Sequence, residues 1–248
     1  MSMPRKIRCK VEAIADHGGR VYTVDLAPAT PVPPFHPGQF LHLTVDDYDP
    51  AGFWPESRVF SIASSPQDRR HIRICYAVKG RYTARMEQAL KPGVEVWIKL
   101  PYGEFFIDPS SDAVLLAGGT GISAFTAFIE ALEPGSLRQV WLVYGAREPD
   151  LLLFRDMILE QSRRVPKFRV LFFTETPNQA FSEQTPAHQP PPQCLPGRIS
   201  LDLIGPRVDG LESKVFYLSG PPIMLTSLSE QLKKRGLPPE RIRTDAWE

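Results

Sequence analysis

The chain has 248 residues, of which 29 are basic and 28 acidic, giving a formal net charge of +1. This length allows two small domains or one large one, and the near-neutral charge gives no electrostatic reason to expect a nucleic acid or an anionic membrane as a partner. No apolar run approaches the roughly 18–20 residues that span a bilayer, and no apolar segment follows the basic N-terminal residues, so we expect a cytoplasmic protein without membrane insertion.

The N-terminal part of the chain contains short, partly alternating apolar segments that are separated by Gly, Pro and Asp clusters. This pattern is typical of a small antiparallel barrel or sandwich. One helix is predicted to interrupt the strands at Thr83–Leu90, because a Lys-Pro-Gly stop signal follows it. The expected strands are Arg8–Ile14, Val21–Leu26, Gln39–Val45, Arg58–Ile62, Ile72–Val78 and Glu95–Lys99.

Near Asp112 the pattern changes, and continuous apolar strands begin to alternate with helical segments. Strands that are apolar on both faces indicate a parallel sheet covered by helices on both sides. We therefore predict two domains, an antiparallel β-barrel over residues 1–110 and an α/β parallel-sheet domain over residues 111–248. The strands expected in the second domain are Ala113–Ala117, Val140–Tyr144, Phe168–Phe173, Lys214–Leu218 and Ile242–Thr244, and the helices are Ala124–Leu132, Leu151–Ser162 and Met224–Arg235.

Residues 176–197 form a polar stretch that is rich in proline. It carries too little apolar surface to offset the entropy of ordering it. We predict a mobile surface loop here, with a lid over a substrate or partner as the alternative.

The cysteines give no sign of a metal site. Cys9, Cys75 and Cys194 are far apart and form no C-x-x-C pair. An iron–sulfur cluster and a structural zinc each need about four clustered ligands, so we expect neither.

Two segments of the first domain carry groups that suit a phosphate. Along a strand, Arg58 and Phe60 point to one face while Ser61 points to the other, and the forked guanidinium of Arg58 is well suited to a diphosphate. An ordinary edge strand with one exposed arginine would show the same short pattern. Further on, a glycine turn at Gly80 leads into a helix, where the backbone N–H groups and the Thr83 hydroxyl also suit a diphosphate.

A glycine-rich turn opens the second domain. Gly119, Thr120 and Gly121 follow an apolar strand and precede a helix, which fits the G-x-G-x-x-G/A pattern of dinucleotide sites. The helix start supplies N–H groups and a favourable dipole for a pyrophosphate. Such turns are also often no more than tight connections.

Arg58–Pro66 and Leu115–Ser123 together resemble the ferredoxin–NADP reductase superfamily, and Pro37–Phe40, Gly80–Thr83 and Pro101–Phe105 resemble further motifs of its flavin domain. The resemblance implies an FAD-binding barrel domain followed by an NAD(P)-binding α/β domain, without a fused iron–sulfur domain. It also implies a flavoprotein oxidoreductase that passes a hydride from NAD(P)H to FAD and electrons on to a protein or small-molecule acceptor. The second phosphate motif favours FAD over FMN.

On the flavin side, the resemblance implies that Arg58 binds the FAD phosphate and that Ser61 acts catalytically near the flavin N5 atom. Phe60 stands where relatives usually have Tyr, so the apolar platform is kept without the hydroxyl. The other residues implied to contact FAD are Cys75, Tyr76, Ala77, Gly80, Arg81, Tyr82 and Thr83.

On the nicotinamide side, the segment from Ser219 to Met224 resembles the Cys-Gly-Pro-Pro-x-Met element of the family. Ser219 replaces the usual Cys and is implied to act near the hydride path. The residues implied to bind the dinucleotide are Gly119, Thr120, Gly121, Arg147, Gly220, Pro221 and Met224.

The choice of dinucleotide turns on Glu175, which follows the third strand where NADP-using relatives often have Ser-Arg. A carboxylate would repel a 2′-phosphate and suit ribose hydroxyls, so NADH is favoured over NADPH. Arg147 could still bind a phosphate, touch the ribose or face water.

Three further points remain open in the sequence. Trp247 either stacks on the flavin ring, in which case it belongs to the catalytic and FAD-binding residues, or pins the chain terminus. The chain could instead be an electron-transfer subunit of a larger redox complex. It could also be a non-catalytic nucleotide sensor with a degenerate flavin site.

Overall fold

A computed structural model describes residues 3–176 and 193–245 of the chain. The described residues form two compact units. One contains the chain up to Phe106 together with Ser123–Phe128, and the other contains Ile107–Ile122 and the residues from Ile129 onward. Each unit has its own sheet and its own hydrophobic core.

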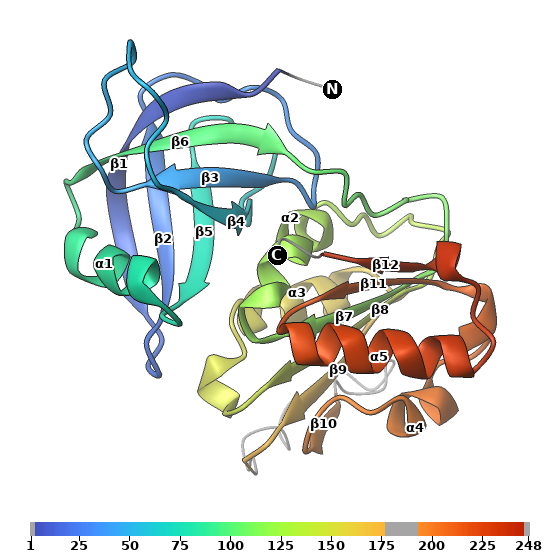
Figure 1. The fold of residues 1–248 in the computed structure, drawn as a ribbon. Helices are drawn as coiled ribbons and strands as arrows, with labels where there is room; N and C mark the ends of the chain where they lie inside the picture. The colour runs from blue at the N-terminus through green and yellow to red at the C-terminus, as the bar shows by residue number, and fades with distance from the viewer. Residues whose placement is uncertain (1–2, 177–192, 246–248) are drawn as a thin grey trace. The chain divides into compact units, whose positions relative to one another are not determined.

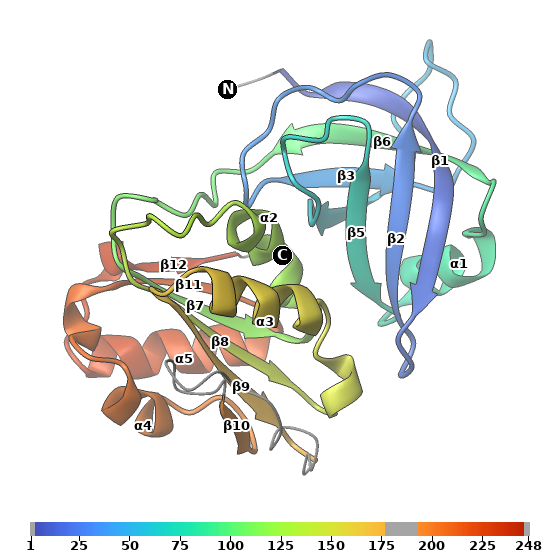
Figure 2. The same cartoon turned by 180° about the vertical axis from the view of Figure 1, so that it is seen from behind.

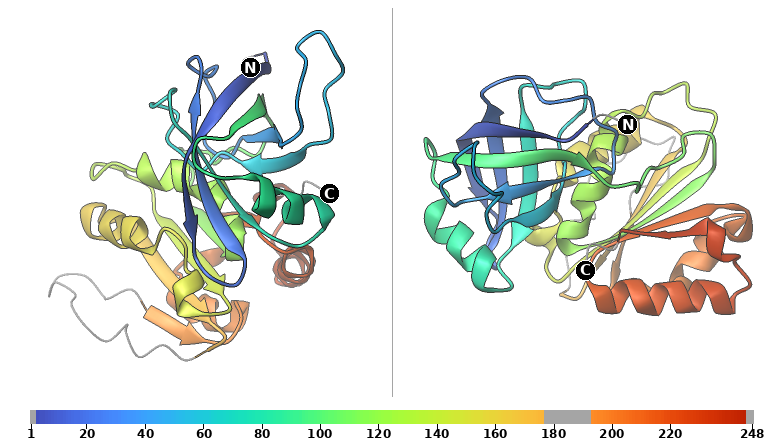
Figure 3. Two further views of the ribbon diagram at one scale, coloured as in Figure 1. Left: turned by 90° about the vertical axis from the view of Figure 1, so that its left-hand side faces the viewer. Right: turned by 45° about the horizontal axis from the view of Figure 1, so that its top comes forward.

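The first unit is an antiparallel six-stranded sheet in the order β4-β3-β6-β1-β2-β5, curved round its core (Figures 1 and 3). The two outer strands approach each other, because the Ala63 N–H just after β4 donates to the Arg73 carbonyl of β5 at 2.8 Å. The sheet is thus a nearly closed barrel, which confirms the predicted fold of this part. Its strands are β1 (Arg5–Asp16), β2 (Val21–Pro28), β3 (Phe40–Thr44), β4 (Arg58–Ser61), β5 (Ile72–Ala77) and β6 (Glu95–Tyr102).

The barrel core follows from alternation along the strands. In β1, Ile7, Cys9 and Val11 are buried while the charged residues between them are exposed, as expected where one face of a sheet packs on a core. The helix α1 (Arg81–Ala89) connects β5 and β6 and buries Tyr82 and Met86, which lie four residues apart on one face. It begins two residues before the predicted start.

Two motifs of the barrel that are distant in sequence meet at one of its ends. A Cβ atom on Gly38, whose φ is +94°, would overlap the carbonyl oxygen of Phe105. The Gln39 side-chain amide donates to the Gly103 carbonyl at 3.1 Å. The segments 37–40 and 101–105 therefore form one packed unit in which Gly38 has no room for a side chain.

The second unit is a parallel six-stranded sheet in the order β10-β9-β8-β7-β11-β12. All six residues of β7 are buried, as expected for a central parallel strand covered on both faces. This confirms the predicted α/β architecture. The strands are β7 (Ala113–Gly118), β8 (Val140–Ala146), β9 (Phe168–Thr174), β10 (Gln193–Pro196), β11 (Val215–Ser219) and β12 (Ile242–Thr244).

Helices cover both faces of this sheet. Figures 1 and 2 show α4 and α5 over one face and α3 over the other, and the buried leucines of α5 pack in one cluster with residues of β7, β8 and β11. The helices of this unit are α3 (Arg155–Arg164), α4 (Leu201–Ile204) and α5 (Pro222–Lys234). The helix α2 (Ser123–Glu130) follows β7 in the chain, but its residues up to Phe128 belong to the first unit. Short 3₁₀ turns lie at Gly119–Ile122, Pro149–Leu151, Gly205–Arg207, Leu211–Ser213 and Pro239–Arg241.

One helix starts later than its periodicity predicts. The expected helix at Leu151–Ser162 begins only at Arg155, because Phe154 has a left-handed backbone with φ of 58°. The hydroxyl of Tyr144 donates to the Leu151 carbonyl at 3.1 Å and accepts the Leu153 N–H at 3.0 Å. The bond to the Leu151 carbonyl takes the acceptor that a helix starting there would have used for the Arg155 N–H.

The strand β10 corrects part of the loop predicted over residues 176–197. Gln193–Pro196 pair in parallel with β9 at the edge of the sheet, where a proline is tolerated because its missing N–H faces no neighbouring strand. Residues 177–192 lie outside the described part of the chain.

Candidate functional site

The α/β unit has its candidate site where the strand order reverses. From β7 the chain runs outward through β8, β9 and β10 and then returns to place β11 on the other side of β7. In sheets of this type, ligands bind beyond the carboxyl ends of the strands at such a reversal. The two glycine-containing motifs of this unit follow β7 and β11, so the fold brings them side by side.

Close packing accounts for most of the glycines at this point. A Cβ atom on Gly121 would lie 2.5 Å from the Ser219 carbonyl carbon and 2.6 Å from the Gly220 nitrogen. A Cβ atom on Gly118 would lie 2.6 Å from the Met224 sulfur, and one on Gly220 would lie 3.0 Å from the Gly118 backbone. These glycines let the ends of β7 and β11 approach each other.

Gly119 differs from its neighbours. It has a φ of +54°, and a Cβ atom there would meet nothing within 4 Å. The backbone of Gly119 therefore borders open space just before Ile122 and the helix α2. A helix start with open space in front of it is the local arrangement that accepts a pyrophosphate.

Ser219 has a partner that the sequence did not reveal. It is buried at the end of β11 and donates a 2.8 Å hydrogen bond to the Asp245 carboxylate, which is buried just after β12. The Asp245 N–H in turn donates to the Leu218 carbonyl at 2.8 Å. Adjacent parallel strands make this contact, and the pairing of β11 with β12 has no signal in a single sequence.

The ends of β8 and β9 carry the groups expected to meet the adenosine ribose. The Arg147 carbonyl accepts the N–H groups of Glu175 and Thr176, each at 3.1 Å. The Glu175 carboxylate lies 3.3 Å from the guanidinium of Arg198. Arg147 itself is exposed. Sequence reasoning overlooked Arg198, which is the cation that pairs with the expected specificity residue.

In the barrel, burial along β4 increases from Arg58 to Ser61 and does not alternate strictly, because Val59 and Phe60 are both partly buried. Ser61 is buried, whereas the Arg58 side chain is 46 % exposed. The ring of Phe60 is partly buried against the core and meets the Tyr76 ring edge-on, with centroids 6.2 Å apart. Arg58 donates to the Ser57 carbonyl at 2.8 Å and lies over the Tyr82 ring at 4.7 Å.

The start of α1 is stabilised by Thr83. Its hydroxyl accepts the N–H groups of Lys79 and Gly80 at 3.0 and 3.1 Å and lies 3.1 Å from the Gly80 carbonyl. A Cβ atom on Gly80 would meet nothing within 4 Å. The turn is thus preformed, with open space at its glycine.

Tyr82 is an internal anchor of the barrel, with only 2 % of its surface exposed. Its hydroxyl accepts the Val45 N–H at 3.2 Å and lies 3.0 Å from the Glu56 carbonyl and 3.2 Å from the Leu43 carbonyl. The structure therefore gives Tyr82 a supporting place beneath Arg58.

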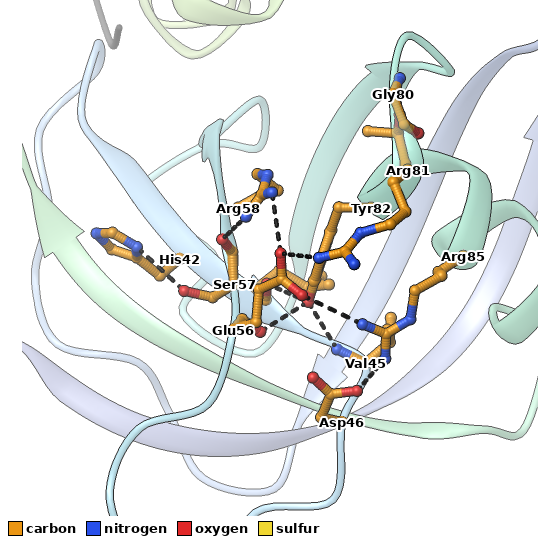
Figure 4. Close-up of polar contacts among 12 residues, drawn as sticks. His42, Val45, Asp46, Glu56, Ser57, Arg58, Gly80, Arg81, Tyr82 and Arg85 are labelled. Atoms are coloured by element: carbon orange, nitrogen blue, oxygen red, sulfur yellow. Dashed lines mark hydrogen bonds and ion pairs between the residues drawn. The ribbon is translucent and has the colours of Figure 1, made fainter.

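A cluster of three arginines surrounds the Glu56 carboxylate (Figure 4). Arg58 and Arg81 approach its Oε1 atom at 3.1 and 3.5 Å, and Arg85 approaches its Oε2 atom at 3.4 Å. Arg85 also pairs with Asp46. We call these five side chains the arginine cluster. Sequence reasoning found Arg58 and Arg81 but missed the other three.

The predicted residues of β5 lie on the barrel strand that precedes α1. Burial raises the pKa of the Cys75 thiol to about 12, although a hydrogen bond with Thr23 acts in the opposite direction. Burial likewise raises the pKa of Tyr76. Cys75 is therefore a neutral, unreactive thiol at physiological pH. Ala77 ends the strand and is partly buried.

The described residues bear on the predictions about the chain terminus, metal sites and membrane spans only within their own range. Trp247 lies outside the described residues. Within residues 3–176 and 193–245, no group of three or more His, Cys, Asp or Glu side chains could hold a metal ion. None of the helices in the described part of the chain combines the length and the apolar character that crossing a membrane requires.

Comparison with known proteins finds similarity to an oxidoreductase domain family and to a reductase. Residues 115–230 match the family model of the oxidoreductase NAD-binding domain. The chain is 28 % identical to the reductase component of propane 2-monooxygenase from Rhodococcus jostii over 253 residues, which cover 97 % of this chain and 63 % of that protein. The chain thus spans less than two thirds of this relative's length.

Solved structures share the fold. The cytochrome P450 reductase GcoB of Amycolatopsis has a TM-score of 0.79 and 23 % identity, over 98 % of this chain and 70 % of that one. A flavohemoglobin from Malassezia yamatoensis, solved with bound FAD and heme, has a TM-score of 0.76 and 22 % identity, over 98 % of this chain and 60 % of that one.

Proposed function

Because the chain belongs to the ferredoxin–NADP reductase superfamily, we propose that it is a flavoprotein oxidoreductase that uses NAD(P)H. In this proposal the barrel unit binds FAD and the α/β unit binds the nicotinamide dinucleotide. The observation that carries it is the presence, in one chain, of the arginine cluster on the barrel and of the glycine-bordered strand reversal in the α/β unit.

The barrel residues fit an FAD diphosphate. Forked arginines and the start of a helix are the groups that bind phosphate oxygens best. The cluster offers both, because Arg58 and Arg81, the first residue of α1, approach the same Glu56 oxygen. Arg58 and Arg81 would hold the diphosphate, and Phe60 with Tyr76 would form the apolar neighbourhood of the flavin. Ser61 would hydrogen bond to the edge of the ring.

The α/β residues fit a dinucleotide pyrophosphate. The open space at Gly119 lies before α2, so a phosphate placed there would meet the N-terminal end of a helix. Thr120 and Gly121 would line this turn. Ser219, held by Asp245, would offer a fixed hydroxyl dipole to the nicotinamide, because its hydrogen bond to a buried carboxylate restricts its rotation.

A bound flavin supplies the redox chemistry, since it accepts a hydride from a reduced nicotinamide and releases electrons one at a time. The protein's own contribution is to bind both cofactors, to fix their orientation and to exclude water. No strong acid or base is required of the side chains.

We further propose that NADH is the preferred donor. The Glu175 carboxylate would repel a 2′-phosphate, although Arg198 partly neutralises it at 3.3 Å. The relative from Rhodococcus jostii is named as the reductase component of a monooxygenase. By analogy, the acceptor would be a partner protein of an oxygenase system.

The test is reconstitution of the purified chain with FAD, followed by turnover with NADH or NADPH and ferricyanide as acceptor. We expect retained FAD, a higher kcat/KM with NADH than with NADPH, and loss of FAD in Arg58→Gln. A chain that retains no FAD would contradict the proposal and would favour a nucleotide-sensing module. Retained FAD without turnover by either dinucleotide would contradict the reductase assignment.

A further inference from the structure

Glu56 lies at the centre of the arginine cluster and belongs to neither of the two phosphate-binding segments. It stands in the connection between β3 and β4, two residues before Arg58. Its side chain is 35 % exposed. The Glu56 carboxylate is therefore partly open to solvent and is not enclosed in the barrel core.

The Glu56 carboxylate occupies the point where the guanidinium groups converge. Its Oε1 atom is within 3.1 Å of Arg58 and 3.5 Å of Arg81, and its Oε2 atom is within 3.4 Å of Arg85 (Figure 4). A phosphate oxygen is the same kind of acceptor for a guanidinium. An arginine donor that is bonded to Glu56 cannot be bonded to a phosphate in the same geometry.

The backbone holds this carboxylate in place. The Glu56 carbonyl lies 3.0 Å from the hydroxyl of Tyr82, and Tyr82 is buried in the barrel core. The side chain is therefore tethered close to the arginines, and its effective concentration there is high. A free anion must compete with a group that never diffuses away.

The cluster does not need Glu56 to neutralise Arg85. Arg85 has a second carboxylate partner in Asp46, so removal of the Glu56 charge leaves Arg58 and Arg81 as the donors that lose a partner. Three arginines then face one carboxylate in place of two. The cluster becomes more positive, and its attraction for a diphosphate increases.

Resting on the FAD site proposed above, we propose that Glu56 competes with the FAD diphosphate for the same arginine donors and thereby sets how tightly the barrel holds FAD. Binding of FAD exchanges the ion pairs of Glu56 with Arg58 and Arg81 for contacts with phosphate. Glu56 thus lowers the affinity for FAD. It does not act by holding the arginines ready for the phosphate.

The test is a fluorescence titration of the flavin-free full chain with FAD. Glu56→Gln keeps the shape of the side chain and removes its charge, and we expect the Kd for FAD to fall about tenfold, which corresponds to about 1.4 kcal/mol. The gain should shrink at high salt, because these partly exposed pairs are screened. Glu56→Ala should give the same direction.

The matched control is Glu95→Gln, which breaks a similar exposed pair on the same barrel, with Arg8 at 3.3 Å. Its Kd for FAD should stay within about twofold of the wild-type value. Riboflavin, which has no phosphate, should bind wild type and Glu56→Gln equally.

Two outcomes would overturn the role of Glu56 and leave the flavin assignment standing. One is a wild-type chain that binds FAD while Glu56→Gln binds it equally or more weakly. The other is an equal gain for riboflavin. A wild-type chain that binds no FAD at any concentration would refute the proposed function itself and, with it, the competition.

Discussion

Replacement of Gly121 by alanine tests whether the ends of β7 and β11 must touch. The added Cβ atom would lie 2.5 Å from the Ser219 carbonyl carbon and 2.6 Å from the Gly220 nitrogen, closer than real Cβ contacts come. Both neighbours are backbone atoms, and the pairing of Ala117 with Ser219 fixes the strand that carries them. Rotation of a side chain cannot relieve this overlap.

The expected cost lies at the upper end of the range for overpacking, about 3 kcal/mol. For a chain of 248 residues, each kcal/mol lowers the Tm by roughly 2–4 °C, so Gly121→Ala should melt about 6–12 °C below the wild-type chain. Gly119→Ala should lose less, about 2–4 °C, because it strains only a left-handed backbone in open space.

Differential scanning calorimetry of the full chain measures these shifts. Gly135→Ala is the matched control, because a Cβ atom there meets nothing within 4 Å, and its Tm should equal or slightly exceed that of the wild type. If Gly121→Ala has the same Tm as the wild-type chain, the close contact between the two strand ends is refuted. An equal drop in the Gly135 variant would likewise refute the steric explanation.

Three further predictions concern single residues. The hydrogen bond from His71 to Asp25 at 2.7 Å raises the pKa of His71. This pair therefore stabilises the folded chain fully below about pH 6.5, and the stabilisation is lost as the pH rises through the raised pKa. Melting curves from pH 6 to 9 should show this loss in wild type but not in His71→Gln. Glu175→Ser should lower the KM for NADPH about fivefold while changing that for NADH little, because a repulsive charge is removed; unchanged steady-state values would contradict this role. Tyr82→Phe leaves the Val45 N–H without its partner at 3.2 Å and should cost about 1–2 kcal/mol in urea unfolding followed by circular dichroism, whereas an unchanged unfolding midpoint would argue against the anchor.

Local signals in the sequence were enough to predict the architecture. Alternation along the early strands and the continuous apolar run of β7 each report burial on one or both faces, and burial decides the kind of sheet. The glycine turns also have local signatures, because the chain must turn there whatever it packs against. These features led to the barrel, the parallel sheet and the order of nearly all elements.

The elements that were missed depend on contacts between distant residues. The late start of α3 follows from hydrogen bonds between the segment before it and the hydroxyl of Tyr144 on β8. The strand β10 forms because β9 offers it an edge. Periodicity within a segment carries no trace of such partners. Tertiary contacts therefore override local propensity at these points.

The same reason explains the gaps in the candidate site. Glu56 and Arg85 are 29 residues apart in sequence, and Ser219 and Asp245 are 26 apart. Each pair exists only because two elements lie next to each other in the folded unit. A charged residue in a loop, taken alone, gives no indication that it is the centre of an ion-pair cluster.

Anaerobic mixing of the FAD-loaded chain with NADH, followed by absorbance at the flavin bands, tests most directly whether the two units act together. We predict rapid loss of the flavin absorbance in the wild-type chain. Thr120→Pro should retain FAD but lose this absorbance much more slowly at low NADH concentrations, because it binds NADH more weakly. A chain that holds FAD firmly but keeps its flavin absorbance in the presence of both NADH and NADPH would contradict hydride transfer between the two sites.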